Sequence, residues 1–520
     1  MAAARPTDEA RPTGEVRPTG EVRLAGPRLT GEPPHILDLV EPRLGGRAAA
    51  VADSTGTFSY RELDEASRAV ARALLARGAR PDEPVVVHGT TASRHTIAAL
   101  LGVLRAGCCY VPVDAGFPEE RRRLMAQGPG ARFVLVPEEN AAVPVADLEH
   151  VDCGAQQVTG QRTGPMDARR GTHAYTCYTS GSTGLPKPVT IAATSLGWST
   201  AARLRHYAER VGAFLLCSSI SFDSSMAGIW WTLASGGLLV LPGGRPGDLL
   251  AVARAAERHG ATHLLMVPSL YGAALRGGLA PRLRTLTTVI VAGESCSPGL
   301  VARHLAELPQ AELYNEYGPT ECTVWATVHA CTPADAHART VPIGRPIAGV
   351  TLHVAEVPDE GPDAPGAGEL YIAGPGLAVP GDREADRFVH LHGTRHYRTG
   401  DLVTVREDGE LLFHGRADHQ LKLGGVRLER AEIERALTLC DGITEAGIGV
   451  SGAPRPRPVG FVVTDGTAFD EQRVRSQLLS SLPTTALPAR VIAVPGLPRL
   501  PNGKVDHGAL DRRAAAAVRR

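Results

Sequence analysis

The segment from Tyr178 to Pro188, YTSGSTGLPKP, concentrates side chains that can bind phosphate. Gly181 and Gly184 allow the backbone to turn tightly with its amide groups pointing inward. The hydroxyl donors of the segment are Thr179, Ser180, Ser182 and Thr183. Lys187 adds a positive charge, so the segment predicts a polyphosphate-binding loop. The alternative is a flexible Ser/Gly loop with no ligand.

This segment is not the P-loop of nucleoside triphosphatases. That motif, G-x-x-x-x-G-K-[ST], requires glycine at position 186 and serine or threonine at position 188. The chain has Pro186 and Pro188 instead, so the motif fails at both positions.

Lysine is almost absent from the chain. Among 55 basic residues only Lys187, Lys422 and Lys504 are lysines, and the others are arginines. Arginine can replace lysine wherever a positive charge on a long stem is enough, but a compact ammonium is better where it must meet a phosphate or a carboxylate. The three lysines are therefore candidates for functional positions.

Seven further motifs lie before and after the loop, in a fixed order along the chain. They are LRAGCCYVPVD (104–114), FDSS (222–225), NEYGPTE (315–321), GELYIAGPGLA (368–378), YRTGD (397–401), GRADHQLKLGGVRLERAEIE (415–434) and PNGKVD (501–506). Together with the loop they resemble the adenylate-forming (ANL) superfamily, in particular free-standing adenylation domains of nonribosomal peptide synthetase type. The resemblance spans about residues 35 to 512, and all three lysines lie within these motifs.

The resemblance implies that a substrate carboxylate attacks the α-phosphorus of ATP, which releases pyrophosphate and leaves an acyl adenylate. Catalysis of this kind depends on positioning and charge neutralisation. By resemblance, Lys504 bridges the substrate carboxylate and the α-phosphate, Glu321 binds Mg²⁺, and Thr320 contacts phosphate. ATP and Mg²⁺ are the expected cofactors.

The resemblance also assigns the ATP site. Tyr317 would stack on the adenine, and Asp401 would accept hydrogen bonds from the ribose hydroxyls with the help of Arg416. The alternative for Asp401 is a turn cap. The expected ATP residues are Thr179, Ser180, Gly181, Ser182, Thr183, Gly184, Lys187, Gly293, Glu294, Asn315, Tyr317, Gly318, Asp401 and Arg416.

Asp223 favours an amino acid as the substrate, because an α-ammonium needs an anionic partner when it is buried. The alternative is that Asp223 only caps the following helix. By resemblance, the residues that surround the substrate, here called the pocket residues, are Asp223, Ser224, Ala227, Met266, Ile290, Ala292, Glu316, Val324 and Trp325. Because some of these pocket residues are small and others are apolar, they predict that the substrate has a flat or long side chain.

Glu316 is the unusual pocket residue, since a second carboxylate there is costly unless a donor reaches it. A nitrogen of the substrate would be such a donor, and the combination with Ser224, Ala292 and Val324 is similar to family pockets that select histidine. L-histidine or a related heteroaromatic amino acid is therefore expected, with tyrosine next. A local salt bridge of Glu316 would remove the main support for this expectation.

Asp418 resembles the hinge about which a small C-terminal domain rotates after adenylation. The second nucleophile would be the phosphopantetheine thiol of a carrier protein, expected in trans because the chain ends shortly after Asp506. A small MbtH-like activator is a further expected partner of many family members. Two positions depart from the family pattern, Pro188 in the loop and Gly424 in the hinge motif.

Strands that alternate with helices predict an α/β fold with largely parallel sheets up to about residue 340, followed by a β-rich subdomain. Expected helices lie at 61–77, 249–259, 429–439 and 470–481, with a further helical stretch that ends at Arg105. Expected strands lie at 85–88, 109–113, 215–222, 237–242, 262–268, 287–293 and 460–464. We expect a disordered leader over 1–34, rich in Pro, Thr and Gly, a large core over 35–417, and a small mobile α+β domain over 418–520.

Composition limits the alternatives. The 55 basic residues equal the 55 acidic residues, which argues against nucleic acid or a membrane surface as a partner. No apolar run is long enough for a membrane span or a secretory signal, so the cytoplasm is expected. Nine scattered cysteines predict reduced core residues. The expected function is amino-acid activation in secondary-metabolite (antibiotic) biosynthesis. An aryl or acyl coenzyme A ligase and a non-catalytic scaffold with the same fold are the alternatives.

Overall fold

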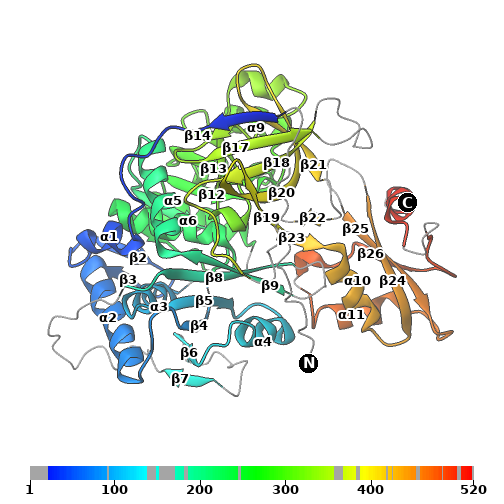
Figure 1. Cartoon of the computed structure of the whole chain (residues 1–520), viewed down its shortest axis with the longest axis horizontal. Helices are drawn as coiled ribbons and strands as arrows, with labels where there is room; N and C mark the ends of the chain where they lie inside the picture. The colour runs from blue at the N-terminus through cyan, green and yellow to red at the C-terminus, as the bar shows by residue number, and fades with distance from the viewer. Residues whose placement is uncertain are drawn as a thin grey trace, which may run out of the picture.

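The computed structural model describes residues 21–90, 93–137, 148–151, 170–180, 186–243, 247–356, 367–381, 387–416, 420–423, 426–451, 457–482, 484–499 and 505–517. Within these ranges the chain forms a large α/β body, a β-rich subdomain and a C-terminal α+β unit. Figure 1 shows the C-terminal unit, in orange and red, beside the large body. The α/β class expected from the alternating pattern is confirmed.

A nine-stranded sheet forms the centre of the large body. Its order is β16-β15-β14-β13-β12-β10-β11-β2-β3. The strands are β2 (Ala49–Ala52), β3 (Thr57–Ser59), β10 (Ala213–Leu216), β11 (Leu238–Val240), β12 (His263–Met266), β13 (Thr288–Ala292), β14 (Glu312–Tyr317), β15 (Thr327–Ala330) and β16 (Arg345–Pro346). The pairs from β2 to β14 are parallel, so the carboxyl ends of β12, β13 and β14 lie at one edge.

A second, six-stranded sheet has the order β7-β6-β4-β5-β8-β9. Its strands are β4 (Pro84–Gly89), β5 (Cys109–Asp114), β6 (Phe133–Leu135), β7 (Glu149–Val151), β8 (His173–Ser180) and β9 (Pro186–Ala192). The predicted phosphate loop connects β8 to β9, which pair as an antiparallel hairpin.

Helices cover both sheets. They are α1 (Ile36–Val40), α2 (Tyr60–Ala76), α3 (Arg94–Arg105), α4 (Glu119–Gln127), α5 (Ala193–His206), α6 (Asp223–Ser235), α7 (Leu249–His259), α8 (Pro268–Arg276) and α9 (Pro298–Glu307). Helix α2 begins with a capping box of Ser59 and Glu62 and buries Leu63, Val70 and Leu74, as its helical spacing predicts.

Two parts of this pattern differ from expectation. The strand expected over 215–222 ends at Leu216, because the amide of Phe222 bonds to the carbonyl of Ser219 in a turn before α6. The expected helices also did not include α1, α4, α5, α8 or α9; of these, α5 lies between the second sheet and α6.

The β-rich subdomain is a six-stranded sheet with the order β1-β17-β18-β20-β19, with β21 paired to β20. Its strands are β1 (Glu21–Ala25), β17 (Thr351–Glu356), β18 (Gly368–Ala373), β19 (Phe388–Leu391), β20 (Thr394–Val405) and β21 (Leu411–Arg416). The expected disordered leader is therefore wrong from residue 21 onward, since β1 pairs antiparallel with β17. An open sheet edge supplies backbone partners that the composition of a segment does not reveal. Residues 1–20 lie outside the described residues.

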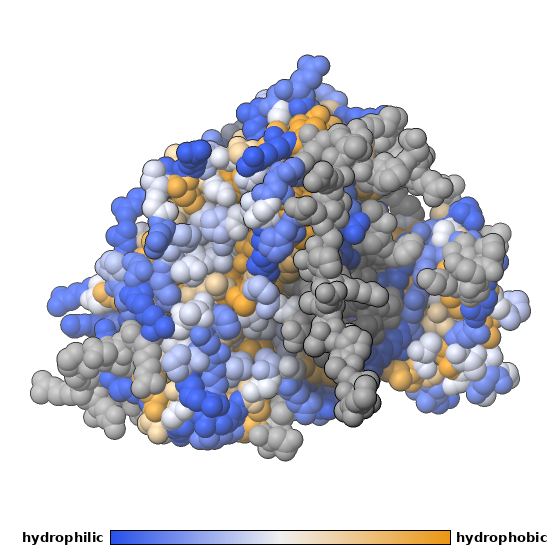
Figure 2. Space-filling model, in the orientation of Figure 1, coloured by the Kyte–Doolittle hydropathy of each residue, from blue (hydrophilic) through white to orange (hydrophobic). Residues whose placement is uncertain are grey.

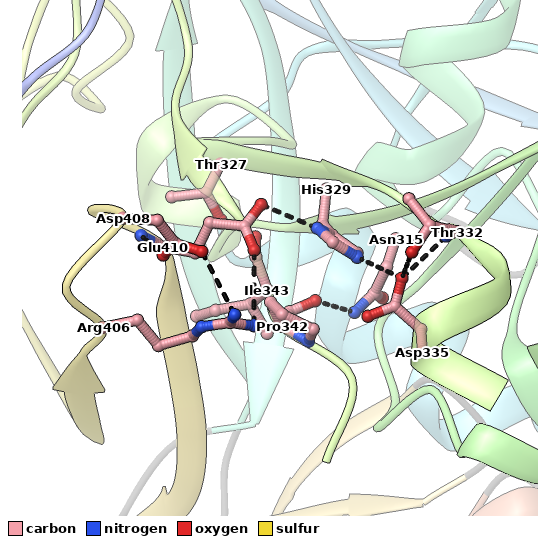
Figure 3. A network of polar contacts seen from close by, with 10 residues as sticks. All are labelled: Asn315, Thr327, His329, Thr332, Asp335, Pro342, Ile343, Arg406, Asp408 and Glu410. Atoms are coloured by element: carbon pink, nitrogen blue, oxygen red, sulfur yellow. Dashed lines mark hydrogen bonds and ion pairs between the residues drawn. The ribbon is translucent and has the colours of Figure 1, made fainter. Parts of the chain in front are cut away.

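A polar network joins this subdomain to the nine-stranded sheet (Figure 3). His329 of β15 contacts Asp335 of the 3-10 helix η4 (Pro333–His337) at 3.0 Å and Glu410, which precedes β21, at 2.8 Å. Burial opposes ionisation of Asp335, but hydrogen bonds from Thr332 and His329 hold the pKa of this carboxyl below its usual range. The network fixes the subdomain against the edge of the sheet.

The C-terminal unit contains β22 (Gln420–Leu423), β23 (Val426–Glu429), α10 (Arg430–Thr438), β24 (Ile443–Ser451), β25 (Arg457–Thr464), α11 (Glu471–Leu478), β26 (Arg490–Ala493) and α12 (His507–Ala517). It has its own apolar core, to which Ile433, Leu437 and Leu478 contribute. The domain boundary at residue 418 stays a prediction, and the hinge candidate Asp418 lies outside the described residues.

None of the helices in the described part of the chain has the length and apolar character that a membrane span requires. On the face of the molecule shown in Figure 2, hydrophilic residues predominate and apolar residues form small groups.

Candidate active site

The N-terminus of α6 brings Asp223 next to Thr320 and Glu321. Asp223 is the first residue of α6, and the hydroxyl of Thr320, in the 3-10 helix η3 (Thr320–Cys322), donates a hydrogen bond to its carboxylate. Burial raises the pKa of the Asp223 carboxyl to about 6, and the charge of Glu321 acts in the same direction. Such a carboxylate gains stability from a cation placed beside it.

Asp223 also accepts a backbone hydrogen bond from the amide of Ser224 at the start of the helix. The N-cap of α6 is nevertheless Phe222, with no side-chain cap hydrogen bond, so Asp223 does not take the capping role that was its alternative. The charge of Glu321 acts on Asp223, and Glu321 is 2% exposed. Two carboxylates in one buried place are typical of a functional site.

Asp401 is held by two protein donors. Tyr317 donates its hydroxyl to Oδ2 of Asp401 at 2.5 Å, and Arg416 donates Nη1 to Oδ1 at 2.5 Å. Asp401 of β20 is the register partner of Arg416 of β21. A carboxylate has about four acceptor sites, so two remain for a ligand such as a diol. Asp401 lies within a strand, which excludes the turn-cap alternative.

A turn with unusual backbone conformation connects η3 to β15. Thr323 and Val324 both have positive φ, 57° and 78°, although β-branched residues rarely adopt this region. The turn is held from outside, since Ser199 donates its hydroxyl to the carbonyl of Thr323 and Thr323 donates its own to the carbonyl of Gly376. Local strain of this kind is typical of functional sites, and here it sets the positions of Val324 and Trp325.

Glu316 does not depend on a substrate for a hydrogen-bond donor. Arg203 of α5 donates both Nη atoms to its carboxylate, at 2.6 and 2.8 Å, and Tyr207 donates its hydroxyl at 2.5 Å. The side chains of Arg203 and Glu316 are each 1% exposed. Burial by itself would lower the pKa of Arg203, but Glu316 holds it above its ordinary value. The expectation that Glu316 needs a substrate nitrogen is therefore wrong.

The pocket residues on β13 and β14 share one face of the sheet. Ala292 is the register partner of Glu316, and Ile290, two residues before Ala292, lies on the same face. Val324 and Trp325 lie in the turn that precedes β15. Ser224 follows Asp223 at the start of α6. Met266 is the exception: it is paired with Val291 and lies on the face of the sheet opposite Ile290 and Ala292.

The expected ATP residues other than Asp401, Tyr317 and Arg416 differ in their contacts. Asn315 donates its side-chain amide to the carbonyl of Pro342 at 2.7 Å, and the Glu294 carboxylate accepts from the Ser269 amide at the start of α8 at 2.9 Å. Gly293 has a φ of 83°, which favours glycine. Thr179 and Lys187 are register partners at the ends of β8 and β9, and Ser180 ends β8. Gly181, Ser182, Thr183, Gly184 and Lys504 lie outside the described residues.

Gly318 is required by close packing. A Cβ atom there would lie 2.4 Å from Cα of Trp325 and 2.6 Å from the carbonyl oxygen of Val324. The glycine therefore allows the end of β14 to lie directly against the strained turn.

Two residues of this region were missed from the sequence, Arg203 and Tyr207. No sequence signal distinguishes them, since arginine is abundant in the chain and the segment matches none of the motifs. Their role depends on contact with a residue more than one hundred positions away.

Comparison with known proteins decides the family. The model of the AMP-binding enzymes matches residues 42–379, and the model of the AMP-binding enzyme C-terminal domain matches residues 432–504. The chain belongs to the AMP-binding enzyme family. The ANL resemblance of the motifs is therefore confirmed.

Sequence similarity to individual members of the family extends over nearly the whole chain. Phosphinothricin tripeptide synthetase PhsB of Streptomyces viridochromogenes is 35% identical over 93% of this chain, and novobiocin biosynthesis protein H of Streptomyces niveus is 33% identical over 93% of it. The solved structure of holo-PA1221, a nonribosomal peptide synthetase protein with adenylation and PCP domains, superposes with a TM-score of 0.78 at 27% identity, covering 92% of this chain and 84% of that one.

The relatives differ in length from this member of the family. The chain spans 83% of novobiocin biosynthesis protein H but only 42% of the phosphinothricin tripeptide synthetase, and it spans 13% of a plipastatin synthase protein of Bacillus subtilis that is 35% identical over 90% of this chain. It therefore matches one part of the longer synthetases.

Proposed function

We propose that this AMP-binding enzyme activates an amino acid with ATP as the aminoacyl adenylate and then transfers it to the phosphopantetheine thiol of a separate carrier protein in secondary-metabolite biosynthesis. In the first step a carboxylate oxygen of the amino acid bonds to the α-phosphorus and pyrophosphate leaves. In the second step the thiol sulfur bonds to the acyl carbon, AMP leaves, and the thiol proton is released.

The observation that carries this proposal is the Asp223 carboxylate at the start of α6. Its raised pKa and the adjacent charge of Glu321 make it a site that is stabilised by a cation. An α-ammonium supplies that cation, whereas fatty and aryl acids, the substrates of coenzyme A ligases, bring no such charge.

The groups around Asp401 support the ATP half of the proposal. Asp401, fixed by Tyr317 and Arg416, has acceptor sites left for the ribose hydroxyls. No cluster of three potential metal ligands occurs among the described residues, and one carboxylate, Glu321, fits Mg²⁺, which is usually held by one or two carboxylates together with phosphates and water. When bound, the ion would neutralise phosphate charge.

The identity of the amino acid is a finer question. Histidine was favoured through Glu316, and Arg203 and Tyr207 now satisfy that carboxylate, so histidine and tyrosine enter the test as two candidates beside uncharged aliphatic and aromatic amino acids.

The relatives support a carrier protein as the partner. PA1221 contains adenylation and PCP domains in one protein, and novobiocin biosynthesis protein H is named for the biosynthesis of novobiocin. A carrier supplied in trans, and an MbtH-like activator, are the partners to include in the assay.

The test is amino-acid-dependent exchange of pyrophosphate into ATP by the purified chain, with all twenty amino acids, several aryl acids, and with and without an MbtH-like protein. We expect exchange with an amino acid and a loss of at least about 100-fold in Lys504→Ala. Arg499→Ala is the control, because Arg499, a few residues before Lys504, forms an exposed ion pair with Glu445. Exchange that peaks on an aryl acid, or no exchange with any acid in the presence of the activator, would overturn the proposal.

A further inference from the structure

Glu316, one of the pocket residues, forms an ion pair with Arg203, which belongs to none of the motifs. Glu316 shares a sheet face with Ala292 and Ile290, and Arg203 approaches it from α5. The guanidinium carbon of Arg203 lies 4.3 Å from the ring centre of Trp325 and 5.8 Å from that of Trp231. Aromatic faces hold the guanidinium in place while both Nη atoms bind the carboxylate.

Three protein hydrogen bonds occupy the Glu316 carboxylate. A carboxylate has about four acceptor sites, and Arg203 and Tyr207 already use three of them. A positively charged substrate side chain at this place would meet Arg203 at close range, in surroundings of low dielectric where like charges repel strongly. The pair as a whole carries no net charge.

We propose that Arg203 is a positioning residue that sets the substrate specificity: by binding Glu316 it removes this carboxylate from substrate recognition, so the enzyme selects an amino acid with an uncharged side chain and rejects cationic ones. This inference rests on the proposed activation of an amino acid. Histidine remains an allowed substrate above pH 7, where its imidazole is largely neutral.

The experiment compares the amino-acid preference of four proteins by pyrophosphate exchange at pH 8: the wild type, Arg203→Met, Glu316→Gln and the double variant. The preference is the ratio of kcat/KM for lysine, ornithine and arginine to kcat/KM for the best uncharged amino acid. Because it is a ratio, the fraction of folded protein does not affect it.

We expect the wild type to use an uncharged amino acid best. Arg203→Met leaves Glu316 as an anion without its cation, so the ratio should rise at least tenfold. Glu316→Gln leaves Arg203 as a cation without its anion, so preference should move toward aspartate and glutamate. The double variant is neutral again, and its ratio should return to within about threefold of the wild-type value.

Two further variants separate specificity from folding. Arg205→Met makes the same chemical change on an exposed position of α5 and should leave the ratio unchanged. Tyr207→Phe removes one donor and keeps the ion pair, so it should raise the ratio by less than Arg203→Met does. If Arg203→Met does not fold, Glu316→Gln decides through its expected move toward aspartate and glutamate, which a purely structural ion pair would not cause.

A wild type that prefers a cationic amino acid would overturn the inference while leaving the proposed function intact. An Arg203→Met variant with an unchanged ratio would also overturn it. If that variant does not fold, a Glu316→Gln variant whose preference does not move toward aspartate and glutamate would overturn it. Absence of exchange with every amino acid would instead remove the proposed function, and with it this inference.

Discussion

Asp223 and Glu316 are two carboxylates among the pocket residues, and their surroundings give them different properties. Glu316 is neutralised by Arg203, whereas Asp223 forms no ion pair with any residue that the structure describes and lies near the charge of Glu321. Burial therefore raises the pKa of Asp223 to about 6. The ionisation of Asp223 thus falls within the pH range in which the protein can be assayed.

Activity should depend on this ionisation. Because protonated Asp223 cannot attract an ammonium, kcat/KM for the amino acid should fall as the pH is lowered through about 6. Asp223→Asn should lower kcat/KM at pH 8 by roughly 100-fold, since a buried charge loses its partner, and should lack this limb of the profile. Pyrophosphate exchange between pH 5.5 and 8.5 measures both. A limb that persists unchanged in Asp223→Asn contradicts the assignment.

The stability of the folded protein should also depend on the ionisation of Asp223. The pKa of Asp223 is higher in the folded protein than its usual value of 3.8, so the folded state binds its proton more tightly; this contribution to stability is fully present below pH 3.8 and is lost as the pH rises through about 6. Asp223→Asn should therefore raise the free energy of unfolding by about 1 kcal/mol at pH 8 and by less at pH 4.5. Thermal melting at the two pH values checks this, and an equal change at both would contradict it.

At the scale of elements, the passage from β14 through η3 to β15 determines the site. It carries Glu316, Tyr317 and Thr320, and then turns through two β-branched residues with positive φ. Gly318 allows this turn to lie directly against the strand.

Gly318→Ala should destabilise the protein by more than about 2 kcal/mol, because the new methyl group would overlap backbone atoms that cannot move independently. It should also raise KM for the substrates, since Tyr317 and Trp325 shift with the turn. Gly299→Ala in α9 is the matched control: nothing lies within 4 Å of its Cβ, and it should gain roughly 0.5–1 kcal/mol. Chemical denaturation of both variants gives the comparison, and similar stability changes would show that the turn tolerates a side chain.

At the scale of the whole molecule, the C-terminal unit contacts the large body close to Asp223. Arg121 of α4 forms a buried ion pair with Glu432 of α10 at 2.6 Å, and Phe222, the residue before Asp223, packs against the core of the C-terminal unit. Phe117 packs edge-on against Phe222. The position of the C-terminal unit and the start of α6 are thus coupled through direct contacts.

Glu432→Gln should loosen this contact, because it leaves Arg121 buried without a charged partner. We expect a larger radius of gyration in small-angle scattering and faster cleavage by trypsin between the two parts. Glu257→Gln is the control, since Glu257 of α7 forms an exposed ion pair with Arg282 within the large body and its loss should change neither. Unchanged scattering and cleavage in Glu432→Gln would show that other contacts hold the unit.

The sequence by itself determined the family, the order of the motifs and part of the elements. Helices such as α2 and α7 and strands such as β4 and β13 were predictable, because their spacing of apolar residues and their caps are local properties. Asp223, Glu321 and Asp401 were found from motif chemistry, and the structure places Asp223 beside Glu321 and fixes Asp401 between Tyr317 and Arg416.

Only the tertiary structure decided which partner each buried charge has. Glu316 and Arg203 lie 113 positions apart, and β1 meets β17 across most of the large body, so neither contact leaves a local pattern in the sequence. The face on which Met266 lies depended on strand register, which one residue reverses. Local spacing predicts elements and motifs, but the environment of a charge is set by residues that folding brings to it from elsewhere in the chain.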